Sequence, residues 1–227
     1  MFKKCIPFVI LFFLANVAFP ANELTTIEKN SIERIEVHDQ IYMKQKGPSF
    51  FKQLSMGQTP MFTILTCSDS RVQTEVFDDN PEGNFFMVRN IGNQLKTSMG
   101  SVDYGVSYLN TKILLIIGHS KCGAIEAIRK GHYKRLKTDV VKELNAIPIR
   151  PGISNISGVV QNVDYQIDEA LKQYAQKIKN HQLVVVGAVY DFADEMNKGA
   201  GELLIINING ETNPTKLKKI IGPTLNN

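Results

Sequence analysis

Apolar residues along this chain form two kinds of pattern. Short continuous runs rich in branched side chains are typical of strands buried on both faces of a sheet. They occupy residues 61–66, 85–88, 112–118, 183–189 and 203–208. Apolar residues spaced three or four apart, which indicate helices, occupy residues 26–46, 97–108, 122–130 and 156–179. Because strands and helices alternate along the chain, the pattern predicts a mainly parallel sheet with crossover helices.

The first of these helices differs from the rest in composition. Residues 26–46 carry their apolar positions among many charges, which predicts an amphipathic helix that wraps a surface rather than filling a core. Gly47 and Pro48 end it, and a second short helix begins near Phe50. We therefore expect an α/β fold: a central, mainly parallel β-sheet flanked by helices, with an N-terminal helical arm.

The extreme N-terminus has the composition of a secretory signal peptide. Two lysines precede an apolar run at residues 6–18, and small residues follow up to Ala21. We expect residues 1–21 to be removed, leaving 22–227 as a single domain that is exported to the periplasm or secreted, with no stable membrane anchor. The alternative is an uncleaved anchor, for which the apolar run is short.

Composition narrows the class of protein further. The chain has 227 residues, of which 43% are hydrophobic and 21% charged, values that suit a globular core and exclude a disordered chain. A net charge of +4, scattered along the chain, does not favour nucleic acid as a partner. Three cysteines are too few for a disulfide scaffold. Cys5 would leave with the signal peptide, and the remaining two, Cys67 and Cys122, would ordinarily pair in an exported protein.

Two polar motifs around these cysteines suggest a different use for them. T-C-S-D-S-R occupies residues 66–71 and G-H-S-K-C-G occupies residues 118–123, each directly after a predicted strand. Ligands of open α/β sheets bind beyond the carboxyl ends of the strands, so we expect the two motifs to meet in space. Cys67, His119 and Cys122 would then form a Cys₂His set. Its sulfur ligands favour zinc, and three protein ligands leave the fourth position open, as in catalytic zinc sites.

Each of these residues has a plainer interpretation when it is considered alone. A single cysteine at a strand end is more often a small buried hydrophobe, and a single histidine is more often a satisfied polar residue. A zinc-binding or redox module without catalysis is also an alternative, although the chain has no C-x-x-C motif. The two motifs together favour a metal site.

The motifs also carry a family resemblance. C-S-D-S-R followed by G-H-S-K-C-G, with M-V-R-N-I-G-N between them, closely resembles the β-class carbonic anhydrases. The likeness covers residues 58–125 and resumes at G-A-V-Y-D, residues 187–191. It implies a homodimer or homotetramer with one zinc ion per subunit, held by Cys67, His119 and Cys122. The implied reaction is the reversible hydration of carbon dioxide to bicarbonate and a proton, by attack of zinc-bound hydroxide on CO₂.

The resemblance assigns roles to further residues. Asp69 and Arg71 match the family's catalytic pair, in which Asp69 orients the hydroxide and Arg71 holds Asp69 away from the metal. An ordinary ion pair that stiffens the loop is the alternative. Five residues are candidates for substrate binding, and some of these positions reach the neighbouring subunit's site in the family: Gln58, Phe86, Ile91, Tyr104 and Gly123. Loop polarity and core packing explain several of them equally well.

The chain departs from the family pattern at Thr66, where glycine is usual, and at Gln73, where proline is usual. It has no tryptophan, so it lacks the complete anion pocket of the bicarbonate-inhibited branch, and an open site is expected. His132 and, less well, His181 are candidates for proton transfer. A relative that hydrolyses carbon disulfide or carbonyl sulfide with the same ligands is the second enzymatic interpretation.

Overall fold

The computed structural model of this chain describes residues 24–150 and 152–222, so the predicted signal peptide lies outside the described residues. The chain divides into two compact units, one ending at Met56 and the other beginning at Gly57.

The first unit is built on helix α1, Thr26–Leu54. Thr25 and Glu28 form a capping box: the Thr25 hydroxyl accepts the Glu28 N–H at 3.2 Å, and the Glu28 carboxylate accepts the Thr25 N–H at 2.7 Å. Gly47 leaves the helical path with φ 74° and ψ 168°, which confirms the predicted break before the second short helix. None of the residues of α1 is buried.

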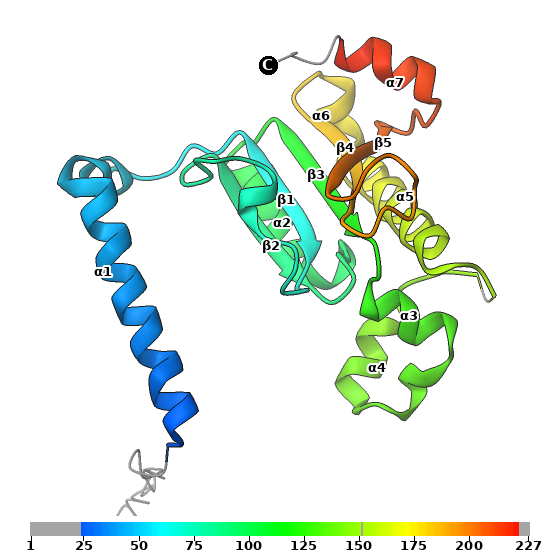
Figure 1. The fold of residues 1–227 in the computed structure, drawn as a ribbon. Coiled ribbons are helices and arrows are strands. Elements are labelled where there is room, and N and C mark those ends of the chain that lie inside the picture. The colour runs from blue at the N-terminus through cyan, green and yellow to red at the C-terminus, as the bar shows by residue number, and fades with distance from the viewer. Residues whose placement is uncertain (1–23, 151, 223–227) are drawn as a thin grey trace, which may run out of the picture. The chain divides into compact units, whose positions relative to one another are not determined.

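The second unit contains one five-stranded sheet, in the order β2-β1-β3-β4-β5 (Figure 1). The strands are β1 Phe62–Cys67, β2 Phe85–Asn90, β3 Ile113–His119, β4 Val184–Asp191 and β5 Glu202–Ile208. The pairs β1–β2, β1–β3 and β3–β4 are parallel, and only β5 runs antiparallel to its neighbour. The predicted mainly parallel sheet is therefore confirmed.

Helices lie between most of the strands and after the last one. The α-helices of this unit are α2 Met99–Asp103, α3 Gly123–Arg129, α4 Thr138–Leu144, α5 Asn155–Gln173, α6 Ala175–Lys179 and α7 Pro214–Ile221. The remaining turns are η2 Thr74–Val76, η3 Lys96–Ser98, η5 His132–Arg135 and the π-helical η4 Tyr104–Tyr108. The sequence pattern did not predict α4 or α7.

The helix predicted over residues 156–179 is interrupted once. Tyr174 leaves the helical conformation at φ −109° and ψ 19°, and separates α5 from α6. Its ring is buried, and its hydroxyl donates to Oδ1 of Asp103 at 2.7 Å. Because Tyr174 is buried and aromatic, it stands where a continuous helix would also carry an apolar residue. The apolar periodicity of the sequence therefore does not reveal the break.

The two faces of the sheet are covered by different helices. Helix α5 packs along β3 and β4 on one face, and α7 contributes Leu217 to a small cluster with Val186 and Ile208. Gly118 at the end of β3 lets α5 approach closely. A Cβ atom at this position would lie 2.7 Å from Val159 and 2.8 Å from Val163.

Replacing Gly118 with alanine should therefore destabilise the fold. The added methyl group forces α5 away from β3, and overpacking of this kind costs about 1–3 kcal/mol. Chemical denaturation gives the free energy of unfolding. Gly100→Ala in α2 is the matched control, because a Cβ there meets no atom within 4 Å and the glycine has no left-handed φ. Equal stability of the two variants would contradict this account of the β3–α5 contact.

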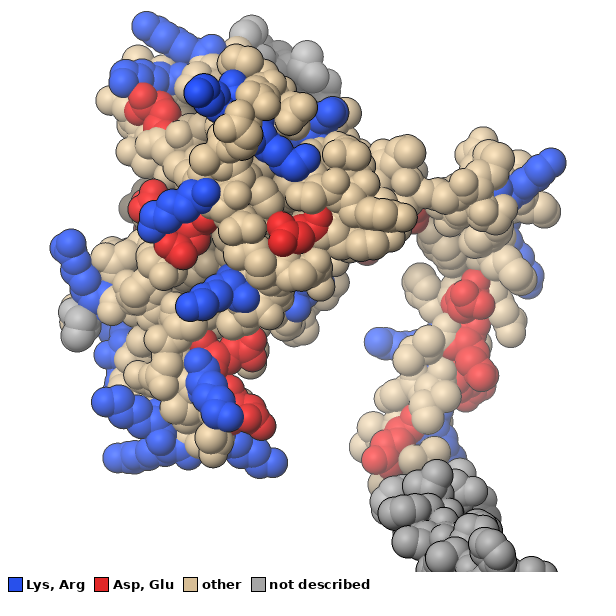
Figure 2. Space-filling model, turned by 180° about the vertical axis from the view of Figure 1, so that it is seen from behind, with Lys and Arg blue, Asp and Glu red and all other residues tan. Residues whose placement is uncertain are grey.

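The surface carries both signs of charge. On the face shown in Figure 2, acidic side chains lie beside basic ones over much of the body. This mixture is in keeping with the small net charge of +4. Among the described residues, no helix combines the length and the apolar character needed to cross a membrane.

Candidate metal centre

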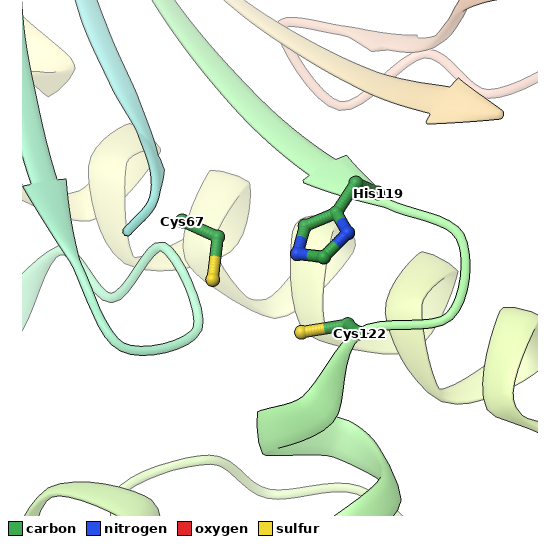
Figure 3. Close-up of side chains that lie close together, drawn as sticks. All are labelled: Cys67, His119 and Cys122. Atoms are coloured by element: carbon green, nitrogen blue, oxygen red, sulfur yellow. The ribbon is translucent and has the colours of Figure 1, made fainter. Parts of the chain in front are cut away.

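Three buried side chains meet at the carboxyl edge of the sheet. Cys67 is the last residue of β1, His119 is the last residue of the neighbouring strand β3, and Cys122 directly precedes α3. Their side chains point toward one another (Figure 3). One ligand atom of each lies within 4.8 Å of the others. The two strand-end motifs therefore meet as predicted, because parallel neighbouring strands end at the same edge.

The imidazole of His119 is oriented with one nitrogen toward the thiols. Its Nδ1 lies 3.0 Å from the carbonyl oxygen of Ser120, which assigns the ring proton to Nδ1 and leaves a lone pair on Nε2. Nε2 is buried and has no hydrogen-bond partner among the described residues. The ring stacks on Phe192, with centroids 5.9 Å apart. A buried nitrogen lone pair without a donor is costly in a purely structural histidine and suits a metal ligand.

The two thiols differ in acidity. The neighbouring Cys122 thiol lowers the pKa of Cys67 to about 4, although burial by itself would raise that pKa. Cys122, which is buried beside Cys67, has a pKa well above its usual range. A divalent cation would stabilise both sulfurs as thiolates, because a metal displaces the proton of a thiol that binds it.

This chemistry fits zinc. Both cysteines are free and buried, and with His119 they supply two soft sulfur atoms and one imidazole nitrogen. Hard cations such as Mg²⁺ and Ca²⁺ prefer oxygen ligands, whereas two thiolates and an imidazole match a zinc site with a fourth position open.

Asp69 and Arg71 form the bidentate ion pair that the sequence predicts. Nε and Nη2 of Arg71 donate to the two carboxylate oxygens of Asp69 at 2.8 and 2.7 Å. These hydrogen bonds hold the pKa of Asp69 well below its usual range, and outweigh the opposite effect of burial. Oδ2 of Asp69 lies 3.8 Å from Nε2 of His119, so the ionised carboxylate faces the metal-ligand cluster.

A turn, and not an extended strand, brings these two residues together. Alternation along extended backbone would point Cys67, Asp69 and Arg71 to one side. Instead, β1 ends at Cys67 and the chain turns, with the Val72 N–H donating to the Asp69 carbonyl at 3.1 Å. The turn, rather than strand alternation, brings Arg71 back onto Asp69.

Arg89 on β2 holds this turn in place. Its guanidinium donates to the carbonyl of Cys67 at 3.1 and 3.2 Å, to that of Asp69 at 2.9 Å, and also to that of Val72. Gln73, which departs from the family pattern, accepts from Arg89 at 3.3 Å. The sequence pattern did not indicate a role for Arg89, although this residue lies within the M-V-R-N-I-G-N segment.

The turn between His119 and Cys122 is held by residues that follow the neighbouring strands β4 and β1 at the same edge of the sheet. Lys121 has a left-handed φ of 53°. Its ammonium group pairs with Glu195 at 2.7 Å, and its carbonyl accepts from Arg71 at 3.1 Å. Phe192 lies beneath the guanidinium of Arg71, 4.8 Å from its central carbon. Phe192 and Glu195 follow the G-A-V-Y-D motif, and only that position in the sequence could have indicated them.

The candidate substrate-binding residues lie at opposite edges of the sheet. Ile91 follows β2 and Gly123 begins α3, so both lie at the edge that carries the metal-ligand cluster. Gln58 precedes β1, and Phe86 is the second residue of β2, where its ring lies 5.6 Å from that of Tyr104. A six-residue strand spans about 20 Å, so these three residues are at the far edge from Cys67 of the same chain.

The two histidines that are candidates for proton transfer, His132 and His181, also lie at different edges of the sheet. His132 is exposed in η5, one turn beyond α3. His181 precedes β4 and is therefore at the edge opposite His119, since β3 and β4 are parallel. The position of His181 does not favour proton transfer within one chain.

Comparison with protein families gives one match that covers most of the sheet. Residues 62–201 match the family described as carbonic anhydrase. Among curated proteins, carbonic anhydrase 2 of Mycobacterium tuberculosis is 29% identical over 154 residues, which cover 62% of this chain and 74% of that protein. Beta carbonic anhydrase 3 of Arabidopsis thaliana is 31% identical over 121 residues, or 47% of each chain.

Solved structures give the same fold. The β-carbonic anhydrase CcaA superimposes with a TM-score of 0.66 at 22% identity, covering 81% of this chain and 89% of its own. The Coccomyxa β-carbonic anhydrase, solved with acetazolamide, gives a TM-score of 0.60 at 23% identity, covering 86% and 92%. A tetrameric β-carbonic anhydrase of the ascomycete Sordaria macrospora also gives 0.60, at 22% identity, covering 81% and 98%.

Proposed function

Because this chain belongs to the carbonic anhydrase family, in its β class, we propose that it hydrates carbon dioxide reversibly at one zinc ion held by Cys67, His119 and Cys122. One observation carries the zinc assignment. The buried lone pair of His119 Nε2 faces two free thiols, and the three ligand atoms lie within 4.8 Å of one another.

Zinc bound here would act as a Lewis acid that lowers the pKa of bound water toward about 7. Two thiolates cancel the charge of the ion, so this site should acidify water less than a site made of three neutral histidines. The protein must therefore add a group that accepts a hydrogen bond from the reacting water and directs its lone pair at carbon dioxide.

Asp69 is the residue proposed for that task. Its Oδ2 faces the metal-ligand cluster, 3.8 Å from His119 Nε2, and its low pKa keeps it ionised. Arg71 engages both carboxylate oxygens and fixes the direction of their remaining lone pairs. The same pair restrains Asp69 from moving onto the metal, which supports a site that stays open.

We infer a homodimer or homotetramer in which residues of two chains complete each site. Ile91 and Gly123 are placed to contribute to the site of their own chain, whereas Gln58, Phe86 and Tyr104 would contribute to the neighbour's. Their location at the far edge of their own sheet supports this assignment. The Sordaria macrospora relative, which is a tetramer, gives further support.

We further propose that the enzyme works after export. The two lysines and the apolar run at residues 6–18 support a signal peptide that is cleaved after Ala21. The mature enzyme would then act in the periplasm or outside the cell.

Stopped-flow hydration of carbon dioxide by the mature, zinc-loaded chain tests the function. We expect hydration well above the buffer rate, rising toward about pH 9 as the site loses a proton. Removal of zinc with a chelator should abolish it, and zinc should restore it. A rate equal to that of buffer at every pH, or carbon disulfide turnover without carbon dioxide hydration, would contradict the proposal.

A further inference from the structure

The side-chain amide of Asn155 holds the backbone of Cys122 on both sides. Oδ1 of Asn155 accepts the N–H of Cys122 at 3.1 Å, and Nδ2 donates to the carbonyl of Cys122 at 3.0 Å. Nδ2 also donates to Oε2 of Glu126 at 3.2 Å. The amide thus uses both of its N–H groups and its oxygen within one turn of α3.

We propose that Asn155 is a positioning residue that fixes Cys122 as a zinc ligand, and that its loss releases the metal faster. This inference rests on the proposed function, because it concerns the zinc site of that enzyme. It assigns a role to a residue 33 positions from Cys122 in the sequence and outside both ligand motifs.

Unlike the other two ligands, Cys122 is not part of a strand that pairs with a neighbouring strand. Cys67 pairs with Asn90 in the β1–β2 ladder, and His119 pairs with Tyr190 in the β3–β4 ladder. Cys122 lies in neither ladder: it follows the left-handed Lys121 and has the extended φ of −64° and ψ of 122° of a helix N-cap. Its carbonyl begins α3 by accepting the Glu126 N–H at 3.0 Å. Its own N–H donates to Asn155.

Only an amide in this orientation satisfies the three contacts. Rotating the Asn155 amide by 180° would point its oxygen at the Cys122 carbonyl and at the Glu126 carboxylate, both of which are acceptors. Aspartate has the same shape but no N–H to donate, and it would add a charge beside Glu126. Alanine removes all three contacts.

Asn155 is held by the helix that it begins, and its partner Glu126 is held by ion pairs along α3. Asn155 is the first residue of α5, which packs along β3 and β4, and the hydroxyl of the N-cap Ser154 accepts the Ser157 N–H at 3.2 Å. Glu126 is paired with Arg129 at 2.6 Å and with Lys130 at 2.7 Å. Asn155 therefore ties Cys122 to the helix that covers the sheet. Partners beyond the ligands themselves typically change metal affinity by 10–100-fold.

The test compares Asn155→Ala and Asn155→Asp with Ser154→Ala in the full mature chain. Ser154→Ala removes the cap of the same helix but leaves every contact to Cys122, so it controls for a weakened α5 N-terminus. Zinc loss to a chromogenic chelator gives the dissociation rate. We expect it to rise by roughly 10–100-fold in both Asn155 variants and by less than about threefold in Ser154→Ala.

A second readout needs neither zinc nor catalysis. In the metal-free chain, hydrogen exchange of the Cys122 amide should speed up at least tenfold in Asn155→Ala, while the amides of β3 keep their protection. Excess zinc should restore hydration in Asn155→Ala to within a few-fold of the wild-type rate, since the variant retains all three ligands.

The outcomes separate this inference from the function on which it rests. If the wild type binds zinc and hydrates carbon dioxide but Asn155→Ala loses zinc no faster than Ser154→Ala, the positioning role is wrong and the function stands. If the wild-type chain binds no zinc at all, the proposed function fails and the role of Asn155 fails with it.

Discussion

Replacing Cys67 with serine should abolish carbon dioxide hydration and zinc binding together. Cys67 ends β1 and is buried within 4.8 Å of the other two ligand atoms. A serine hydroxyl is a poor substitute for a thiolate at a zinc site. Because loss of a partner outside the ligand set already costs about 10–100-fold in affinity or activity, loss of a ligand should exceed that range.

The measurement pairs hydration kinetics with the zinc content of the purified variant. Ser70→Ala is the matched control, because Ser70 is exposed on the same loop, three residues further along the chain. It should keep one zinc ion per chain and the wild-type rate. If Cys67→Ser retains one zinc ion per chain and hydrates carbon dioxide at nearly the wild-type rate, Cys67 is not a zinc ligand.

The second large effect is expected for Asp69→Asn, which should keep zinc and lose hydration. Asparagine preserves the shape of the side chain but replaces one of the carboxylate oxygens that accept from Arg71 by a donor. It also removes the negative charge facing the metal-ligand cluster. Groups that accept or direct a proton during reaction typically contribute about 10²–10⁴-fold, so we expect a fall in kcat/KM of at least 100-fold.

Zinc content distinguishes this result from simple loss of the site. Asp69→Asn should retain one zinc ion per chain, in contrast to Cys67→Ser. Asp79→Asn provides the isosteric control, since Asp79 is exposed on the loop that follows η2. If Asp69→Asn hydrates carbon dioxide at the rate of Asp79→Asn, the Asp69–Arg71 pair is an ordinary ion pair that stiffens the loop.

The sequence predicted the metal-ligand cluster because its signals are local. Each ligand motif directly follows a continuous apolar run, and such runs are strands in an α/β chain. Once β1 and β3 are parallel neighbours, Cys67 and His119 must emerge at the same edge. The residue types and the parallel direction of the two strands were therefore enough to predict that two residues 52 positions apart lie close together.

The supporting contacts could not be predicted in the same way. Arg89 reaches the Cys67 turn from the neighbouring strand, Phe192 stacks under His119 from the end of β4, and Asn155 reaches Cys122 from the start of α5. None of these residues has a spacing that marks it. Their roles depend on how the strands and helices pack, which periodicity does not encode.

Two further differences have local physical causes. The apolar spacing over residues 156–179 continues through Tyr174, whose buried ring conceals the break between α5 and α6. Helix α7 begins at Pro214 and is capped by Asn213, whose side chain accepts the N–H groups of Thr215 and Lys216. Its apolar face is short, so the cap was its main signal in the sequence.

The cysteine count has a consistent explanation in this account. Cys67 and Cys122 are buried, free and adjacent in space, although an exported protein would ordinarily oxidise such a pair. The proposed zinc ion would bind both as thiolates, which accounts for two neighbouring cysteines that are not paired in a disulfide.

X-ray absorption at the zinc edge of the mature, zinc-loaded enzyme would identify the metal ligands themselves. We expect two sulfur ligands at about 2.3 Å and two nitrogen or oxygen ligands at about 2.0–2.1 Å, one from His119 and one from solvent. Cys122→Ser should reduce the sulfur count from two to one or release the metal. A shell of nitrogen and oxygen alone, or of four sulfurs, would contradict the assignment of Cys67, His119 and Cys122 as the zinc site.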